Sequence, residues 1–321
     1  MEKHGFQFPA SRHRIADADI AARVAAAMRV CLSDVLGRSD SDVALLISEE
    51  LERVIPKNVV RHLTDCGIEL TGKRVLDLGA GLGGLSEELA LHDASVVAIE
   101  PGLHWGQLAR DRLGPYPNVA VVHGIGEHLP FRDDSFDAIV SLQVLEHVED
   151  PATVLREAFR VCRPGGTFFL SCENYLSFRE AHYVVGWLPL LPKRIGRVYL
   201  RLRGRSPEFL DNSITYTTLP GVLRDLRKAG FVLRSESAIA RKVDEPESFV
   251  RKPARLLVGL LKRLLPHSIL VRILVMLKTL TRLFTNVVYE LCDKPMPPTA
   301  SSAARPLART TAMPPAAPVG S

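Results

Sequence analysis

The spacing of hydrophobic residues divides the chain into a helical part and an alternating part. Across 15–35 and 41–66, apolar residues recur at the spacing of amphipathic helices. From Arg74 onward, short apolar runs alternate with segments of helical spacing, which predicts a parallel sheet with right-handed crossovers. The first five predicted strands are 74–78, 95–100, 119–123, 138–142 and 167–171.

Segment 174–215 interrupts this alternation after the fifth strand, with two Leu-Pro steps and a basic run. Because ligands bind beyond the carboxyl ends of the strands in such sheets, we expect this segment to be a lid over an acceptor site. Residues 1–66 are expected to form a helical flap over the same crevice. After the lid, 217–229 has helical spacing, and 230–233 starts a sixth strand.

A second unusual segment lies within 245–284. Two basic amphipathic helices are predicted there, divided by Pro266. Three interpretations are open: a layer packed on the rest of the fold, a membrane-surface element with Trp187 nearby, or a dimer interface. Residues 295–321 are rich in Pro, Ala, Ser and Thr, and we expect them to be a disordered tail.

The chemistry starts at the end of the first predicted strand, which reads Asp77-x-Gly79-x-Gly81-x-Gly83. Residues without a Cβ allow a sharp turn and a close ligand. The next strand ends on Glu100, where a carboxylate can hold a ribose diol. The dinucleotide fingerprint has a different glycine spacing, and Asp77 would repel a pyrophosphate. An ammonium group would instead suit Asp77.

Further signatures follow in order. Leu-Pro-Phe begins at Leu129 and Ser-Phe-Asp at Ser135, Leu-Glu-His begins at Leu145, and Arg-Pro-Gly-Gly begins at Arg163. Together with the Asp77 motif, they resemble the class I S-adenosylmethionine-dependent methyltransferases of small-molecule type. Within this family, the chain is similar to the ubiquinone-pathway O-methyltransferases and to bacterial saccharide or lipid O-methyltransferases. The resemblance covers 60–175 closely and 216–240 loosely.

The resemblance implies a Rossmann-like, doubly wound α/β fold with seven mostly parallel strands, the last over 285–292. The pair of helices within 245–284 is then an insertion between strands 6 and 7, and the methyltransferase domain runs over 67–294. The implied cofactor is S-adenosyl-L-methionine. Its expected contacts are Asp77, Leu78, Gly79, Ala80, Gly81, Gly83, Glu100, Trp105, Ile125, Gly126 and Gln143.

Two of these contacts have alternatives. Trp105 lies where the family places an apolar side chain against adenine, or else it belongs to the core of the following helix. Ile125 stands where family members often carry an acid that holds the adenine amino group. Adenine would then rely on backbone groups, or on Glu127 in place of that acid.

The candidate catalytic residues are His147, His182 and Glu173. A histidine beyond the fourth strand has a pKa suited to a general base, so His147 is the first candidate. The ubiquinone-pathway enzymes have an E-x-x-E-H metal motif here. This chain has Gln143 in place of the first acid, and we expect no metal.

Composition sets the remaining expectations. The five cysteines are scattered without a Cys-x-x-Cys pair, and no signal peptide or spanning helix is predicted, which favours the cytoplasm. Residues 179–294 hold 22 Lys and Arg against 10 Asp and Glu, whereas the remainder holds 19 against 26. A basic half favours an anionic partner, such as the inner face of the cytoplasmic membrane contacted through 250–284.

We therefore expect O-methylation of a small lipophilic or lipid-linked acceptor, such as a saccharide, a quinone precursor or a glycolipid. RNA methylation and a non-catalytic regulatory subunit that binds the cofactor are the alternatives. The basic half would permit nucleic acid, but we expect none, because the chain lacks a base-flipping motif or a zinc module. A homodimer stays open.

Overall fold

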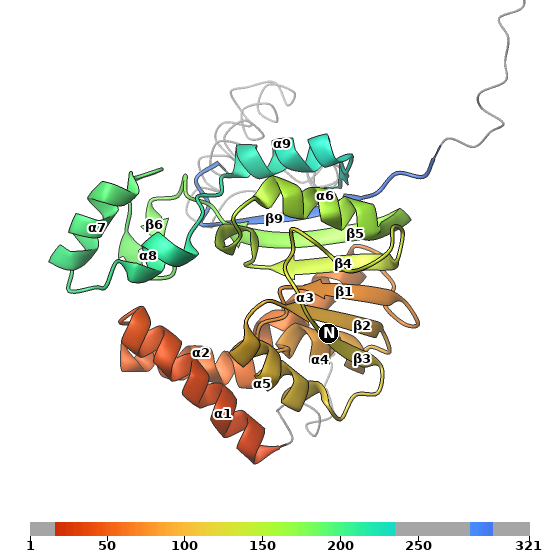
Figure 1. Cartoon of the computed structure of the whole chain (residues 1–321), viewed down its shortest axis with the longest axis horizontal. Coiled ribbons are helices and arrows are strands. Elements are labelled where there is room, and N and C mark those ends of the chain that lie inside the picture. Colours follow the sequence, from red (N-terminus) through yellow and green to blue (C-terminus); the bar gives the residue numbers. More distant parts are fainter. Residues whose placement is uncertain (1–16, 235–282, 298–321) are drawn as a thin grey trace, which may run out of the picture.

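A seven-stranded sheet forms the centre of the molecule (Figure 1). The computed structural model describes residues 17–234 and 283–297 of the 321 in the chain. The strand order is β3-β2-β1-β4-β5-β9-β8, and only β9 runs antiparallel to its neighbours. The predicted fold class is therefore confirmed. The strands are β1 (Arg74–Leu78), β2 (Ser95–Glu100), β3 (Val119–His123), β4 (Phe136–Leu142), β5 (Cys162–Glu173), β8 (Val232–Leu233) and β9 (Val287–Asp293).

Helices cover both faces of this sheet, as its apolar strands require (Figure 1). On one face, α6 (Pro151–Val161) and α9 (Leu219–Ala229) close the larger core cluster. On the other, α3 (Val54–Asp65) and α4 (Gly84–Leu91) pack against the middle strands, and α5 (Leu103–Leu113) packs beside β2 and β3. Both clusters consist of buried aliphatic and aromatic side chains.

The N-terminal flap is divided more finely than the sequence pattern predicts. It consists of α1 (Ala18–Arg29), a π-helical turn η1 (Val30–Val35) and α2 (Asp40–Leu51), followed by α3. The predicted helical stretch 41–66 breaks at Arg53, which has a left-handed backbone with φ of 55°. The buried guanidinium of Arg53 pairs with Glu87 and Glu88 of α4, and these ion pairs hold the break in place.

The lid is a small unit with a core of its own, seen at the left of Figure 1. It contains β6 (Arg179–Glu180), β7 (Val185–Gly186), α7 (Lys193–Leu202) and α8 (Glu208–Ser213). Its core is built from aromatic and aliphatic residues of the lid together with one residue of the flap, Leu36. The buried members are Leu36, Tyr175, Tyr183, Val185, Trp187, Leu200, Leu210 and Ile214.

The Arg-Pro-Gly-Gly element differs from the predicted turn before a strand. β5 already begins at Cys162 and contains the element, with Gly165 at φ 76° and a register shift where β5 pairs with β4. The predicted helices within 245–284 and the predicted tail from 298 onward lie outside the described residues. Among the helices that the structure does describe, none is long and apolar enough to span a membrane.

Candidate functional site

The glycine-rich turn after β1 has the backbone that only glycine adopts easily. Gly79 and Gly81 have φ of 80° and 51°. A Cβ on Gly79 would lie 2.3 Å from the side chain of Val144, so a larger residue does not fit. A Cβ on Gly81 would meet nothing within 4 Å, which shows that this part of the turn faces open space. The loop therefore offers its backbone to a ligand.

Glu100 connects this turn to the loop after β2. One carboxylate oxygen accepts a hydrogen bond of 2.8 Å from the backbone N–H of Gly81, and the other accepts one of 2.8 Å from Gly102. Because each oxygen has a second lone pair, the carboxylate can still accept from two neighbouring hydroxyls. This arrangement suits a ribose diol, as the sequence predicted for Glu100.

A cavity of about 530 Å³ opens beside these two loops. Leu78 and Gly79 line one end, while Ile125 and Gly126 line the part beyond β3. Glu127 also lines the cavity, and its carboxylate accepts a hydrogen bond of 3.1 Å from the backbone N–H of Glu149. The structure thus brings together four of the predicted contacts and places Glu127 where it could face the same ligand.

Other predicted contacts lie outside this cavity. Asp77 is buried behind the turn and accepts a hydrogen bond of 2.6 Å from the Ser86 hydroxyl of α4. Ala80 is also buried, and Gly83 caps the start of α4 in a left-handed conformation. Trp105 of α5 lines a second cavity instead. Asp77 and Gly83 therefore shape the loop, while Trp105 faces the flap.

Gln143 follows β4 and has a left-handed backbone with φ of 56°. This conformation costs free energy in any residue that has a Cβ. With its amide nitrogen facing the acids, it donates to Glu146 at 2.7 Å and to Glu173 at 3.0 Å. Its amide oxygen then accepts from the Ser171 hydroxyl at 3.3 Å. Gln143 thus links two carboxyl groups rather than lining the first cavity.

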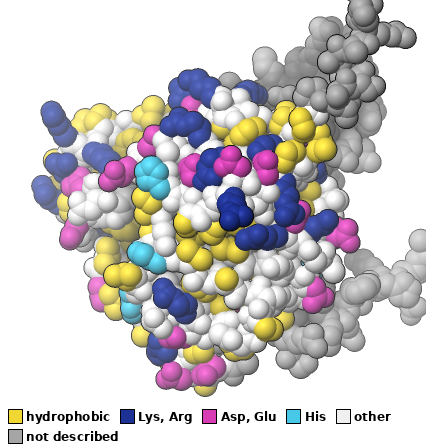
Figure 2. Space-filling model, turned by 45° about the vertical axis from the view of Figure 1, so that its right-hand side comes forward, with side chains coloured by type: hydrophobic (Ala, Val, Ile, Leu, Met, Phe, Trp, Pro, Cys, Tyr) yellow, Lys and Arg dark blue, Asp and Glu magenta, His cyan; other side chains and the backbone are white. Residues whose placement is uncertain are grey.

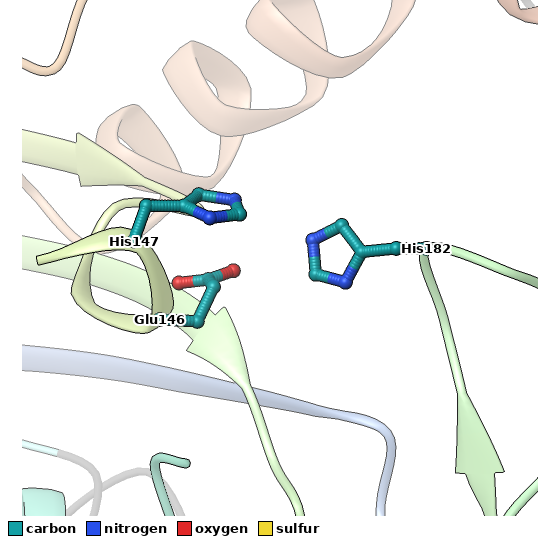
Figure 3. A group of neighbouring side chains, drawn as sticks. All are labelled: Glu146, His147 and His182. Atoms are coloured by element: carbon teal, nitrogen blue, oxygen red, sulfur yellow. The ribbon is translucent and has the colours of Figure 1, made fainter. Parts of the chain in front are cut away.

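Glu146, His147 and His182 meet beyond the carboxyl end of β4 (Figure 3). Glu146 and His147 come from the short helix after β4, whereas His182 reaches them from the turn between β6 and β7 of the lid. The two imidazole rings are edge to face, with centroids 5.1 Å apart. Glu146 is fully buried, and its Oε2 has no hydrogen-bond partner among the described residues.

The hydrogen bonds fix the tautomer of both histidines. His147 Nδ1 lies 2.7 Å from the backbone oxygen of Ser213, which can only accept, so Nδ1 carries the proton. His182 Nδ1 lies 2.9 Å from a carboxylate oxygen of Glu180, and the same reasoning protonates that nitrogen. In each neutral ring, Nε2 keeps a lone pair and can accept a proton.

Glu180 is a functional candidate that the sequence analysis missed. Its carboxylate is buried and also accepts a hydrogen bond of 2.6 Å from the backbone N–H of Tyr183. Burial is the largest influence on the pKa of His182 and lowers it. The hydrogen bond to Glu180 and the negative charges of Glu180, Glu146 and Glu173 together outweigh burial, so that pKa is raised above its ordinary value. An acid two residues before a histidine in a lid was the only sequence signal.

Two more acids surround the histidine pair. Burial raises the pKa of Glu146 and that of Glu173 to about 7. Glu173 ends β5, and its backbone N–H donates to Glu146 over 3.2 Å. The predicted catalytic residues His147, His182 and Glu173 therefore lie in one cluster, joined through Glu146.

Comparison with known proteins assigns the sheet domain beside this site to a family. Residues 76–170 match the family model described as a methyltransferase domain. Residues 76–170 form a class I S-adenosylmethionine-dependent methyltransferase domain. This confirms the predicted family and its cofactor.

Two relatives show how far the similarity extends. The ubiquinone biosynthesis O-methyltransferase of Pseudomonas putida strain W619 is 37% identical, over 38% of this chain and 56% of the relative. That of Pseudomonas fluorescens strain SBW25 is also 37% identical, with the same shares. The match therefore spans little more than half the length of these relatives. A solved S-adenosylmethionine-dependent methyltransferase from Mesorhizobium loti is 19% identical over 70% of this chain and 92% of its own, with a TM-score of 0.43.

The first cavity and the two loops beside it fit S-adenosylmethionine. The turn of the methyltransferase domain leaves space above Gly81, and Glu100 holds that turn with acceptors to spare. The cavity reaches His147 at its other end. Leu78 and Gly79 would face the methionine part, Glu100 the ribose, and Ile125 and Gly126 the adenine.

A metal ion fits the cluster of Glu146, His147 and His182 less well than S-adenosylmethionine fits the first cavity. Glu146, His147 and His182 each offer one ligand atom, and these atoms lie within 4.8 Å of one another. However, the position of the first acid in the E-x-x-E-H motif is taken by Gln143, whose amide donates toward Glu146 and Glu173. In this orientation the amide nitrogen of Gln143 faces the acids and offers no ligand atom to a cation there, so we derive no step through a metal.

A second cavity lies between the flap, α5 and the lid, and measures about 600 Å³. Its walls are mostly apolar, with Val30 and Val35 on one side and Trp105 and Leu108 on the other. Phe209 of the lid closes one end, and its ring centroid lies 5.3 Å from that of His182 and 5.8 Å from that of His147. An apolar compartment thus ends at the histidine pair.

Proposed function

We propose that this chain is an S-adenosylmethionine-dependent O-methyltransferase in which His182 is the general base. The observation that carries this proposal is the buried Glu180 carboxylate, which holds His182 in one tautomer opposite His147 and Glu146. A base oriented by a carboxylate is the arrangement that takes a proton from a hydroxyl. His147 came first in the sequence analysis, but it is exposed and has only a backbone carbonyl behind it.

The protein groups would act as follows. When bound, S-adenosylmethionine would supply a methyl group on a sulfonium, whose carbon–sulfur bond breaks to leave a neutral thioether as the methyl group passes to the acceptor oxygen. His182 Nε2 accepts the proton of the acceptor hydroxyl, and Glu180 stabilises the resulting imidazolium. His147 Nε2 accepts a hydrogen bond from the acceptor and so helps to orient it.

The acceptor is a lipophilic or lipid-linked hydroxyl compound, such as a quinone precursor, a saccharide lipid or a glycolipid. Its apolar part would occupy the second cavity, whose end wall Phe209 touches both histidines. Apolar cavities with a few converging polar groups are typical of such ligands. The relatives named for ubiquinone biosynthesis support a quinone precursor as the acceptor.

The test uses tritium in the methyl group of the cofactor. Cell extracts are incubated with purified protein and separated into lipid, small-molecule, RNA and protein pools. Label is expected in the lipid or small-molecule pool. His182→Ala should lower the turnover rate by roughly 100-fold or more. His92→Ala is the matched control, because His92 pairs with Glu88 on α4, outside both cavities.

Other outcomes would count against the proposal. Label found only in RNA would replace it with RNA methylation. No transfer into any pool, together with cofactor binding, would support a regulatory subunit. Full activity of both His182→Ala and His147→Ala would show that neither histidine is a general base and that the protein acts by holding the reactants close together.

A further inference from the structure

The outer face of α7 has an apolar stripe where a surface helix normally carries polar residues. Ile195, Val198 and Leu202 are 56%, 55% and 82% exposed. Their spacing of three and four residues places them on one side of the helix. We propose that this stripe binds the surface of an anionic lipid membrane.

The orientation of the stripe is fixed by what lies behind it. Leu200 is buried in the lid core, and Gly196 packs against Trp187 so closely that a Cβ there would lie 2.7 Å from the indole ring. The helix cannot turn its stripe inward without opening this core. α7 also lies at the end of the lid that is farthest from the sheet (Figure 1), so a flat surface could reach it.

The charges around the stripe indicate the sign of the partner. Between Glu180 and Glu208 the chain has six Lys and Arg and no acid. Arg194 and Arg201 of α7 are exposed on the flank of the stripe, whereas Arg197 is paired with Asp211 of α8. Figure 2 shows Lys and Arg side chains at the left-hand edge of the molecule, beside hydrophobic ones. Basic residues next to an exposed apolar stripe are typical of helices that lie in the membrane interface.

The loop before α7 also exposes apolar side chains. Leu188 and Leu190 are 62% and 46% exposed and flank Pro189. A second copy of this chain is a less suitable occupant, because a two-fold contact would bring the arginines of both stripes together. A membrane with anionic head groups instead accepts the leucines and neutralises the arginines.

The test is co-sedimentation of the full chain with vesicles. One set contains phosphatidylglycerol and phosphatidylcholine, and the other contains phosphatidylcholine alone. Wild-type protein is expected to bind the anionic vesicles, with binding that weakens as salt rises. Val198→Asp with Leu202→Asp should reduce the bound fraction about 10-fold, and Arg194→Ala with Arg201→Ala should reduce the preference for anionic vesicles.

The matched control is Leu45→Asp, because Leu45 is 58% exposed on α2 in the flap. It should bind vesicles like the wild type. Three results would overturn the proposal: no vesicle binding by the wild type, equal binding by the stripe variant, or equal loss in Leu45→Asp. Conversion of a dimer to a monomer by the stripe variant would assign the stripe to a second copy. The affinity for S-adenosylhomocysteine should stay the same in every variant, because none of the changed residues lines the first cavity, and this separates the proposal from the function itself.

Discussion

Asp77 and Glu100 lie near the carboxyl ends of neighbouring strands and carry the same functional group, yet their surroundings give them different tasks. Glu100 accepts two backbone hydrogen bonds from the loops beside the first cavity. Asp77 is buried behind the loop and bonded to Ser86. Burial raises the pKa of Asp77 to about 7, from 3.8. The sequence suggested an ammonium ligand for Asp77, but the structure supports a role in holding the start of α4.

Asp77→Asn should therefore change the pH dependence of stability. The folded protein keeps the Asp77 proton at pH values where the unfolded chain has lost it. The stability that neutral Asp77 contributes is therefore complete below about pH 4 and is lost as pH rises to about 7. The asparagine stays neutral. The difference in unfolding free energy, variant minus wild type, should therefore rise by about 1.4 kcal/mol per pH unit across that window and stay constant above it. Urea unfolding at several pH values measures this, and a constant difference would contradict it.

Glu100→Gln tests the other carboxylate. An amide in this place puts an N–H group against one of the two backbone N–H donors of Gly81 and Gly102, so the loop loses an acceptor. Hydrogen bonds to a charged group are worth about 1.5–3 kcal/mol, which predicts roughly 10-fold to 100-fold weaker binding of S-adenosylhomocysteine. Isothermal titration calorimetry measures the affinity. Unchanged affinity in a folded variant would remove Glu100 from the cofactor site.

At the scale of elements, the flap is joined to the sheet domain by buried ion pairs. Glu87 of α4 binds Arg53 before α3 and Arg112 of α5, and Arg112 also binds Glu50 of α2. The Tyr116 hydroxyl donates to Glu87 as well, over 2.8 Å. Such a network is costly to break at one point, because the remaining charge stays buried without its partner.

Arg53→Met should lower the free energy of unfolding by about 3–5 kcal/mol, because Glu87 and Glu88 lose a buried cation. Arg61→Met is the matched control, since Arg61 is exposed on α3 and bonded only to Asn58 among the described residues. That change should stay within about 0.5 kcal/mol. Denaturant unfolding compares the two, and a similar loss in both variants would contradict the network.

Elements were predictable from sequence where local pattern and burial agree. β1 and β2 are buried on both faces, so their apolar runs are continuous and their bounds match the prediction. The break at Arg53 was not predictable, because it depends on acids of α4 that lie 34 and 35 residues away. The lid core and the contact of His182 with Glu146 likewise depend on packing between distant segments, for which the sequence holds no periodic signal.

At the scale of the whole molecule, the flap and the lid meet above the candidate active site. Arg38 follows η1, and its guanidinium donates to the backbone oxygens of Ala181 and His182 over 2.7 Å and 2.9 Å. Leu36 enters the lid core, and Arg205 of the lid donates to the backbone oxygen of Leu36 over 3.3 Å. The turn that carries the proposed base is thus held by a segment 144 residues away.

Arg38→Ala should separate positioning of the base from binding of the cofactor. Without the guanidinium, two carbonyl oxygens beside His182 lose their donors, and the turn between β6 and β7 is free to shift. A shift of about 1 Å at a reacting group can cost up to 100-fold, so turnover should fall roughly 10-fold to 100-fold. The affinity for S-adenosylhomocysteine should stay within about twofold, because Arg38 lines neither the first cavity nor the loops around Glu100.

The controls for this prediction lie on the same segment. Arg29→Ala removes an exposed arginine from the end of α1 and should leave turnover unchanged. Arg38→Lys keeps the charge but not the planar fork that reaches both carbonyls, so it should restore turnover only in part. Turnover with tritiated cofactor and calorimetric affinity are measured for all three variants. Equal losses of turnover and cofactor affinity in Arg38→Ala would show that the flap supports the whole domain rather than the base, because a positioning contact changes turnover alone.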